Sequence, residues 1–541
     1  MTGLGADMQN DAMTTQTVAG HLVEALYRRG TRRLYGVPGG GSSLDLIAAA
    51  ESLGMTFVLA RSENAAVMMA AADADISGAP GAALTTKGPG LAQAMNGLAH
   101  AALDRAPVIC ITDGFSETLK AYVTHQVFDQ EGMSRPVVKA HSRLDGDEPT
   151  AEIERLIDLA CAPCRGPVHI ELTGAAARRQ AAPTAMTASP ATSACLSLDD
   201  ARVLLSQARR PVVVVGLEAR SASEATLRLV ESLGCPVLTT YKAKGVIPDA
   251  HPARVGLFTC GTAEAPTLER ADLIVLVGLD PVELILQPWR YDVPVLDIAE
   301  IHHQPHYTNI SAGVYGPLIP NLNTLTGRNS ASDWTPDDIR DLANAMRSAI
   351  SFPEGAAIDP QVIVQAAAKH LSDARITVDA GAHMLSATGF WPADRPNDLQ
   401  ISNGLASMAF ALPAAIATGL ADPSRRVIAF TGDGGLKMCV GELATAVQYA
   451  VPVTVIVFND GALTLIDLKQ QQRGLKSAGV RWPRTDFAAV ARGFGCVAWR
   501  VTTKAEYEAA LIEAEQAPGP SLIDVVLDPG GYAAQLKAMR G

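Results

Sequence analysis

Short apolar runs alternate with amphipathic or alanine-rich segments along most of the chain, and this pattern is the main clue to the fold. From Thr15 to about Ala175, segments with helical spacing separate buried runs that end in Gly, Pro or polar turns. Such an alternation predicts a parallel sheet with helices on both faces. The expected strands are Leu34–Val37, Thr56–Leu59, Ala82–Thr85, Pro107–Thr112 and Pro167–Leu172, and the expected helices are Val18–Arg29, Leu44–Leu53, Ala65–Ser77 and Leu91–Asp104.

The same alternation returns twice more. Residues Ala176 to Ala194 form an Ala/Pro/Thr/Ser-rich stretch without periodicity, which is typical of a linker. A polar stretch, Asn321 to Asp337, precedes an expected helix, Asp338–Ile350. We therefore predict an α/β protein of three doubly wound domains on mostly parallel sheets, at residues 15–178, 195–325 and 355–530. The expected strands of the last two are Pro211–Val215, Pro236–Thr239, Leu273–Val277, Pro294–Ile298, Arg375–Val378, Arg426–Phe430, Pro452–Phe458 and Ser521–Val526.

Composition agrees with a compact globular protein. The chain has 541 residues, 48% of them hydrophobic and 18% charged, which fits three domains with large cores. The net charge is −12 and no basic run is present, so nucleic acid is not an expected partner. No apolar run is long enough to predict a transmembrane span. The scattered cysteines indicate a reducing, cytoplasmic setting, and Cys161 and Cys164 are interpreted as a helix end, not a redox pair.

One strand–helix–strand unit, from Arg425 to Asp467, carries candidate chemistry. Its first strand ends in Thr431-Gly432-Asp433-Gly434-Gly435, a helix is expected over Met438–Tyr449, and the second strand closes on Asn459-Asp460-Gly461. The carboxyl ends of neighbouring parallel strands form the ligand-binding edge of such sheets. Oxygen-bearing side chains among glycines there suit a hard cation that holds a phosphate group. The unit predicts a Mg²⁺–diphosphate site.

Several motifs together resemble a known family. Gly432-Asp433-Gly434 with Asn459 at the expected spacing is similar to the diphosphate-binding motif of thiamine-diphosphate-dependent enzymes. Further resemblances are Arg61-Ser62-Glu63, Pro38-Gly39-Gly40, Gly88-Pro89-Gly90 with Asn96, and Asn403 to Met408. The resemblance covers nearly the whole chain and implies pyrimidine-binding, central and diphosphate-binding domains. That order resembles the acetohydroxyacid (acetolactate) synthase large subunit and benzaldehyde lyase.

The resemblance implies how the cofactor is held. Thiamine diphosphate and Mg²⁺ are the implied cofactors, with Asp433 and Asn459 as side-chain ligands of the metal and Gly461 as a carbonyl ligand. The amides of Gly434 and Gly435 are implied donors to the diphosphate. Taken alone, this turn is also compatible with an ordinary helix start that Asp433 caps. The other implied cofactor-binding residues are Glu63, Gly381, His383, Ala406 and Met408.

Two implied residues act on the reacting end of the cofactor. Glu63 would hydrogen-bond the aminopyrimidine ring and favour removal of the thiazolium C2 proton, which requires shielding from water and a raised pKa. Gln126 would face the thiazolium ring from a partner subunit, with Gln130 as a rival for that position. Met408 would support the bent cofactor. Ala406 stands where Gly is frequent, a departure expected to cost only local flexibility. Lys87 is a candidate for binding a substrate carboxylate.

The resemblance indicates the reaction less specifically than it indicates the cofactor. The histidines typical of simple 2-oxo acid decarboxylases are absent near Thr86 and from Thr112 to Ser116. The best match is therefore acetolactate synthase-like: decarboxylation of a 2-oxo acid, then carboligation to a second carbonyl. A benzaldehyde lyase-like enzyme, a 2-hydroxyacyl lyase or a 2-oxo acid decarboxylase is the alternative, and a non-catalytic cofactor-binding homologue is a remote one. The implied unit is a homodimer or homotetramer, with the cofactor between chains.

The central domain carries one further expectation. Synthases of this kind bind FAD there, but the segment Leu284–Trp289 lacks the Arg-Phe-Asp-Asp-Arg pattern that these enzymes commonly have. FAD is therefore a doubtful cofactor for this chain.

Overall fold

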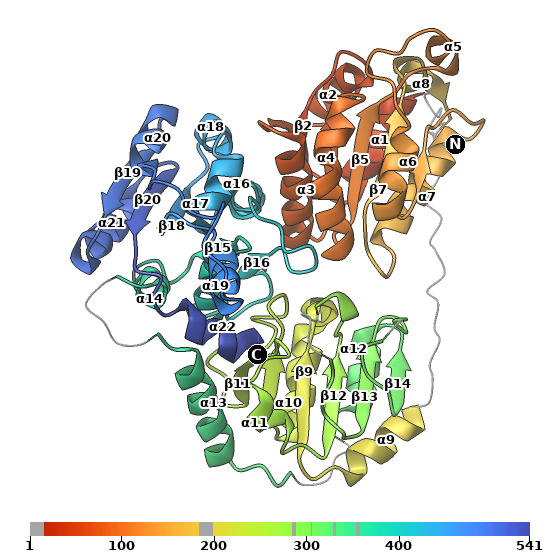
Figure 1. Cartoon of the computed structure of the whole chain (residues 1–541). Helices are drawn as coiled ribbons and strands as arrows, with labels where there is room; N and C mark the ends of the chain where they lie inside the picture. The colour runs from red at the N-terminus through yellow and green to blue at the C-terminus, as the bar shows by residue number, and fades with distance from the viewer. Residues whose placement is uncertain are drawn as a thin grey trace, which may run out of the picture.

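The computed structural model describes residues 16–182, 198–283, 288–304, 306–327, 332–352 and 358–540. Three α/β lobes make up this structure, each built on a six-stranded sheet (Figure 1). Every described strand pair within these three sheets is parallel. The expected fold class is confirmed. The predicted domain limits at 15, 195 and 355, and residues 183–194 of the predicted linker, lie outside the described residues.

In the N-terminal lobe the strand order is β3-β2-β4-β5-β7-β6. Its central strands are apolar throughout because successive residues enter cores on opposite faces of the sheet. Ile109 and Ile111 pack with α1, α2 and α7, while Val108 and Cys110 pack with α3 and α4. The elements are β1 Gln16–Thr17, α1 Val18–Arg28, β2 Arg33–Val37, α2 Ser42–Ser52, β3 Thr56–Leu59, α3 Glu63–Ser77, β4 Gly81–Thr85, α4 Pro89–Leu103, β5 Val108–Asp113, α5 Glu117–Lys120, α6 Gln130–Ser134, η1 Arg135–Val137, β6 His141–Ser142, α7 Pro149–Cys161, β7 Val168–Leu172, α8 Gly174–Arg178 and β8 Gln180–Ala181.

The central lobe has the order β11-β10-β9-β12-β13-β14, so the chain reverses direction across the sheet between β9 and β12. Such a reversal opens a crevice at the carboxyl ends of the strands. The elements are α9 Leu198–Gln207, β9 Pro211–Val215, η2 Leu217–Ala222, α10 Ser223–Leu233, β10 Val237–Thr239, β11 Arg254–Leu257, α11 Ala265–Leu268, β12 Leu273–Val277, η3 Pro281–Glu283, β13 Val295–Ala299, β14 Ala312–Tyr315, α12 Leu318–Leu325 and α13 Pro336–Ile350.

The C-terminal lobe has the order β16-β15-β17-β18-β20-β19, with its reversal between β15 and β17. Helix α16 faces the N-terminal lobe and shares one hydrophobic core with α3 and α4 (Figure 1). The elements are α14 Pro360–His370, β15 Arg375–Val378, α15 His383–Phe390, β16 Leu399–Ile401, α16 Ala411–Ala421, β17 Val427–Gly432, α17 Asp433–Cys439, α18 Glu442–Gln448, β18 Val453–Asn459, α19 Thr464–Gln472, α20 Phe487–Phe494, β19 Val497–Val501, α21 Lys504–Gln516, β20 Ser521–Val526 and α22 Tyr532–Arg540.

Two expectations about local structure were wrong. The helix expected over Met438–Tyr449 is two helices, α17 and α18, because the chain turns at Val440 and Gly441 so that Glu442 can accept hydrogen bonds from Arg61 and Ser62. The predicted linker also begins later than expected. Its first residues form the end of α8 and then β8, which pairs antiparallel with β1.

Two further expectations concern the pair Cys161 and Cys164 and the presence of membrane-spanning helices. Cys161 ends α7, ahead of β7, as expected for a helix end, and it is a free thiol, like Cys164. None of the helices in the described ranges combines the length and the apolar character that crossing a bilayer would take.

Candidate active site

The candidate site lies where β15, β17 and β18 end, beside the chain reversal of the C-terminal sheet. Strands β17 and β18 are neighbours, with Gly432 opposite Phe458. A cavity of about 250 Å³ opens at these strand ends. The predicted residues that line it are Gly381, His383, Ala406, Met408, Asp433, Gly434 and Gly435. These residues come from well-separated parts of the chain, and the fold brings them together.

Asp433 and Asn459 follow the two neighbouring strands, as the sequence predicted, and both are buried. Asn459 Nδ2 donates to Asp524 Oδ1 at 2.7 Å and to the Thr485 carbonyl at 2.9 Å, which fixes the orientation of the amide. Its Oδ1 is buried and has no hydrogen-bond partner. Burial raises the pKa of Asp433, although a hydrogen bond from Trp482 opposes the shift. A fixed, unpartnered amide oxygen at the end of β18, the strand next to the one that leads into Asp433, fits a Mg²⁺ ligand pair.

The turn after β17 is closely packed. A side chain at position 435 would place its Cβ 2.2 Å from Asp379 Oδ2, so only glycine fits there. The Gly434 amide donates to Asp433 Oδ1 at 2.9 Å, so in this structure it serves the carboxylate of the neighbouring residue. The Gly461 carbonyl, the third implied metal ligand, accepts from the Trp482 amide at 3.0 Å. A carbonyl has a second lone pair, so a metal contact is still compatible with this bond.

His383 begins α15 and is buried against Phe458, with ring centroids 5.1 Å apart. Burial lowers the pKa of His383 to about 4. Its Nε2 has no hydrogen-bond partner although it is buried. His383 lines the cavity, so one residue of its wall carries an unpartnered buried polar atom.

Met408 lies over the turn after β17, since a Cβ at Gly434 would be 3.3 Å from Met408 Cε. Its loop is strained: Ala406 has φ 54° and Ala409 has φ 63°. The left-handed region costs a residue with a Cβ about 1–2 kcal/mol. The expectation that Ala406 costs only local flexibility was therefore wrong, because this position favours glycine on steric grounds.

Glu63 is the first residue of α3, in the N-terminal lobe, and is half-buried. The N-cap of this helix is Ser62, whose Oγ accepts from Ala65 N at 3.2 Å, so Glu63 is not the capping side chain. Burial raises the pKa of Glu63. The preceding turn is fixed from the other lobe, because Glu442 Oε1 accepts from Arg61 N at 2.9 Å and from Ser62 N at 3.1 Å.

The two candidate glutamines differ in their surroundings. Gln130 is buried, and its side chain accepts from Gly88 N at 3.0 Å and donates to the Asp113 carbonyl at 3.3 Å. Gln126 is exposed in the loop before α6 and has φ 62°. Lys87 lies with its Nζ 4.8 Å from the centre of the Phe115 ring. Four predicted site residues do not line the cavity: Glu63, Gln126, Asn459 and Gly461. Its lining comes entirely from residues 380–540 of the described chain.

Sequence reasoning missed several residues at the site. Trp482 Nε1 donates to Asp433 Oδ2 at 2.7 Å. Asp460 lines the cavity, and burial raises its pKa to about 6, helped by the charge of Asp433. Only Asp460 had a visible signal, since it directly follows Asn459. Further lining residues that were not predicted include Leu463, Ile466, Tyr532 and Arg540.

Three family models match consecutive parts of the chain. The thiamine pyrophosphate enzyme N-terminal TPP binding domain matches residues 16–133, the central domain matches residues 198–314, and the C-terminal TPP binding domain matches residues 379–525. The first and last of these contain Glu63 and the Asp433–Asn459 pair, respectively.

Curated relatives are similar over nearly the whole length. The chain is 30% identical to the acetolactate synthase isozyme 3 large subunit of Escherichia coli (strain K12), over 96% of each chain. It is 29% identical to the isozyme 1 large subunit of the same organism, over 95% of this chain and 94% of that one. It is 27% identical to the acetolactate synthase of Bacillus subtilis (strain 168), over 94% of this chain and 92% of that one. The chain therefore belongs to the thiamine-pyrophosphate-dependent enzymes, as an acetolactate synthase-like member of that family.

Proposed function

We propose that the protein decarboxylates a 2-oxo acid such as pyruvate and joins the remaining acyl unit to a second carbonyl compound, as an acetolactate synthase does. The observation that carries this proposal is the buried pair of Asp433 and Asn459 at the ends of neighbouring strands, with Asp433 lining the cavity. The similarity to acetolactate synthases over nearly the whole chain supports the choice of reaction.

The metal would be held by the side chains of Asp433 and Asn459 and by the carbonyl of Gly461. The free, buried Oδ1 of Asn459 supports this assignment, because a buried acceptor without a partner is costly unless something binds it. Mg²⁺ prefers oxygen ligands and is commonly bound together with phosphate groups. The fluorescence of Trp482 should respond to metal binding, because its indole nitrogen donates a hydrogen bond to Asp433.

We propose that the complete site needs two chains. The cavity is lined by the C-terminal lobe, whereas Glu63 and Gln126 belong to the N-terminal lobe and lie outside it. The N-terminal lobe of a second copy would supply both residues, which makes a homodimer the smallest active unit and a homotetramer a pair of such dimers. The described cysteines are free thiols, which supports the reducing cytoplasm as the compartment.

The bound cofactor supplies an electron sink for the carbon from which carbon dioxide leaves. Glu63 would exchange a proton through its carboxyl group, whose pKa burial raises. Met408 would support the bound cofactor, and Gln126 of the partner subunit would orient the reacting group. Phe458, Leu463 and Ile466 give the cavity apolar walls that exclude water.

Incubation with pyruvate, Mg²⁺ and thiamine diphosphate should yield acetolactate, detected after acid conversion to acetoin. Adding the cofactor with Mg²⁺ should also quench tryptophan fluorescence, because Trp482 contacts Asp433. Quenching without any product from pyruvate would refute the proposed substrate but not the cofactor site. Cleavage of a benzoin or 2-hydroxyacyl compound instead would point to a lyase.

We propose that the central lobe does not bind FAD, on the basis of the crevice lining; residues 284–287 of the segment Leu284–Trp289 lie outside the described residues. The crevice beside β9 and β12 holds a cavity of about 210 Å³. Glu283 occupies the backbone donors there, since its Oε2 accepts from Leu217 N at 2.8 Å and from Asp280 N at 3.3 Å. Asp75, Glu218, Asp280 and Glu300 also line the cavity, and they disfavour a diphosphate despite three arginines among the lining residues.

We therefore expect the purified enzyme to form acetolactate without bound FAD. The measurement is flavin fluorescence of the supernatant after heat denaturation of protein that was purified in excess FAD. Release of one flavin per chain would show that the crevice opens to accept it and that the proposed exclusion is wrong.

A further inference from the structure

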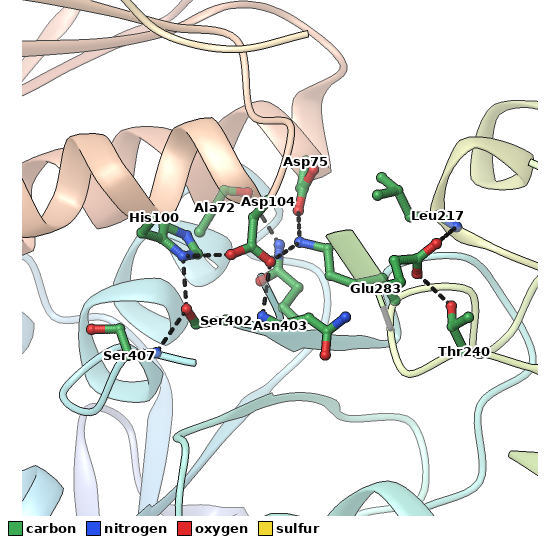
Figure 2. Close-up of polar contacts among 12 residues, drawn as sticks. Ala72, Asp75, His100, Asp104, Leu217, Thr240, Glu283, Ser402, Asn403 and Ser407 are labelled. Carbon is green, nitrogen blue, oxygen red and sulfur yellow. Dashed lines mark hydrogen bonds and ion pairs between the residues drawn. The ribbon is translucent and has the colours of Figure 1, made fainter. Parts of the chain in front are cut away.

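A buried polar network connects all three lobes beside the candidate site (Figure 2). Lys242, from the loop after β10 in the central lobe, is only 4% exposed. Its Nζ lies 3.3 Å from Asp104 Oδ1 and 3.4 Å from Asp75 Oδ2, both in the N-terminal lobe. Arg220 also pairs with Asp75, at 3.2 Å. The two carboxylates thus face two cations, and Lys242 is the one that reaches Asp104.

From Asp104 the network continues into the C-terminal lobe. Asp104 Oδ1 accepts from Asn403 N at 2.9 Å. His100 Nδ1 lies 3.0 Å from Asp104 Oδ2 and 3.0 Å from Ser402 Oγ. Ser402 Oγ in turn accepts from Ser407 N at 3.0 Å. Figure 2 shows these contacts as an unbroken series from the Asp75 and Asp104 carboxylates to Ser407, the residue before Met408.

The loop at the end of this network is strained. Ala406 and Ala409, on either side of Met408, both have positive φ values, of 54° and 63°. Residues in such conformations persist only where surrounding contacts over-determine them. The contacts here are the two backbone donors, Asn403 N and Ser407 N, which the network satisfies at the start and in the middle of the loop.

We infer that Lys242 and His100 are positioning residues, which hold the Met408 loop in its strained form through Asp104 and Ser402. Lys242, in the central lobe, thereby sets the geometry of the candidate active site although it does not line the cavity. The catalytic part of this inference rests on the proposed function, because it takes Met408 to support the cofactor. The structural part, that Lys242 and His100 hold the Met408 loop, is independent of the proposed function.

The charge of Lys242 has a specific role in this arrangement. Burial alone would raise the pKa of Asp104, but Lys242 and His100 hold that pKa well below its usual value. An ionised Asp104 accepts from Asn403 N, and its Oδ2, 3.0 Å from His100 Nδ1, favours the imidazole tautomer that carries its proton on Nδ1. Without Lys242, the two buried carboxylates would lack one of their cations. Asp104 would then either take up a proton or move its side chain away from Asn403.

The test compares Lys242→Met and His100→Leu with two controls. His100→Asn keeps a side-chain amide that can donate near the position of Nδ1. Lys244→Met removes another buried lysine from the same central-lobe loop, one that pairs with Asp249 and makes no hydrogen bond or ion pair with the Met408 loop in the described chain. Amide hydrogen exchange of residues 402–410 is measured on each protein without cofactor, followed by kcat, KM and the affinity for thiamine diphosphate with Mg²⁺.

Lys242→Met and His100→Leu should speed hydrogen exchange of the Ser407 amide about tenfold, because that is the usual effect of losing one hydrogen bond. Lys244→Met and His100→Asn should leave this exchange rate unchanged. In the two loss variants kcat should fall at least about tenfold, with KM and cofactor affinity nearly unchanged because Asp433 and Asn459 are untouched. Unchanged exchange, or an equal effect of Lys244→Met, would overturn the inference. If wild-type protein is inactive with pyruvate, the proposed function fails, whereas the exchange result still decides whether the network holds the loop.

Discussion

We expect Glu63→Gln to lower kcat by roughly 10²–10⁴-fold, the usual contribution of a positioned proton-transfer group. The amide keeps the size and the hydrogen-bonding reach of the side chain but cannot exchange a proton. Affinity for thiamine diphosphate with Mg²⁺ should stay within a few-fold of wild type, because the metal ligands lie in the other lobe. Steady-state kinetics and tryptophan quenching measure the two quantities separately.

The fold supplies a matched control for this variant. Ser62 caps α3, so Ser62→Ala should destabilise the helix by about 1 kcal/mol yet retain the carboxyl group. Its kcat should remain close to wild type. If Ser62→Ala were as inactive as Glu63→Gln, the loss would reflect the helix end and not the proton. Near-normal kcat in Glu63→Gln would refute the assigned role.

The pH profile gives a second measurement on the same residue. Burial raises the pKa of Glu63, so its carboxyl group keeps its proton to higher pH than an ordinary glutamate. Activity that depends on the ionised form should therefore be lost as pH falls through this raised pKa, and the acidic limb should lie above the range of an exposed glutamate. Glu63→Gln should lack that limb in its residual activity.

Interior strands were predictable from the sequence because they are buried on both faces. Strands such as β9 and β12 are continuous apolar runs, and their predicted bounds match the structure. Within the three six-stranded sheets, the strands not expected from the sequence all lie at sheet edges: β6, β11, β14, β16 and β19. Strand β19, VAWRV, is largely exposed and carries no such signal.

The site was predictable only where local sequence carries its chemistry. Asp433 and Asn459 end strands, so the rule that ligands bind at carboxyl strand ends was enough to pair them. Trp482 follows an exposed loop and bonds Asp433, and Arg540 ends the last helix and lines the cavity. Neither position has a sequence pattern that indicates a place at the site. The Lys242 network is still less visible, because its members come from three lobes and meet only after these pack together.

We expect Asn459→Ala to weaken binding of thiamine diphosphate with Mg²⁺ by roughly 100-fold or more, since even residues that only orient a metal ligand commonly contribute 10–100-fold. Asp524 is such an orienting residue: its Oδ1 accepts from Asn459 Nδ2 at 2.7 Å and so turns the amide oxygen away from itself. Asp524→Asn should therefore weaken binding about 10–100-fold although it leaves both side-chain ligands in place. Titration of tryptophan fluorescence, with Mg²⁺ varied at saturating cofactor, measures both effects.

Asp486→Asn is the matched control for Asp524→Asn. It changes the net charge by the same amount on a neighbouring segment, but Asp486 caps α20 through Ala489 N and does not contact Asn459. Asparagine caps helices as well as aspartate does, so this variant should bind the cofactor like wild type. Weakened binding in Asp486→Asn would mean that net charge, not orientation, controls affinity. Normal binding in Asn459→Ala would place the metal elsewhere, because no other change removes the unpartnered oxygen so directly.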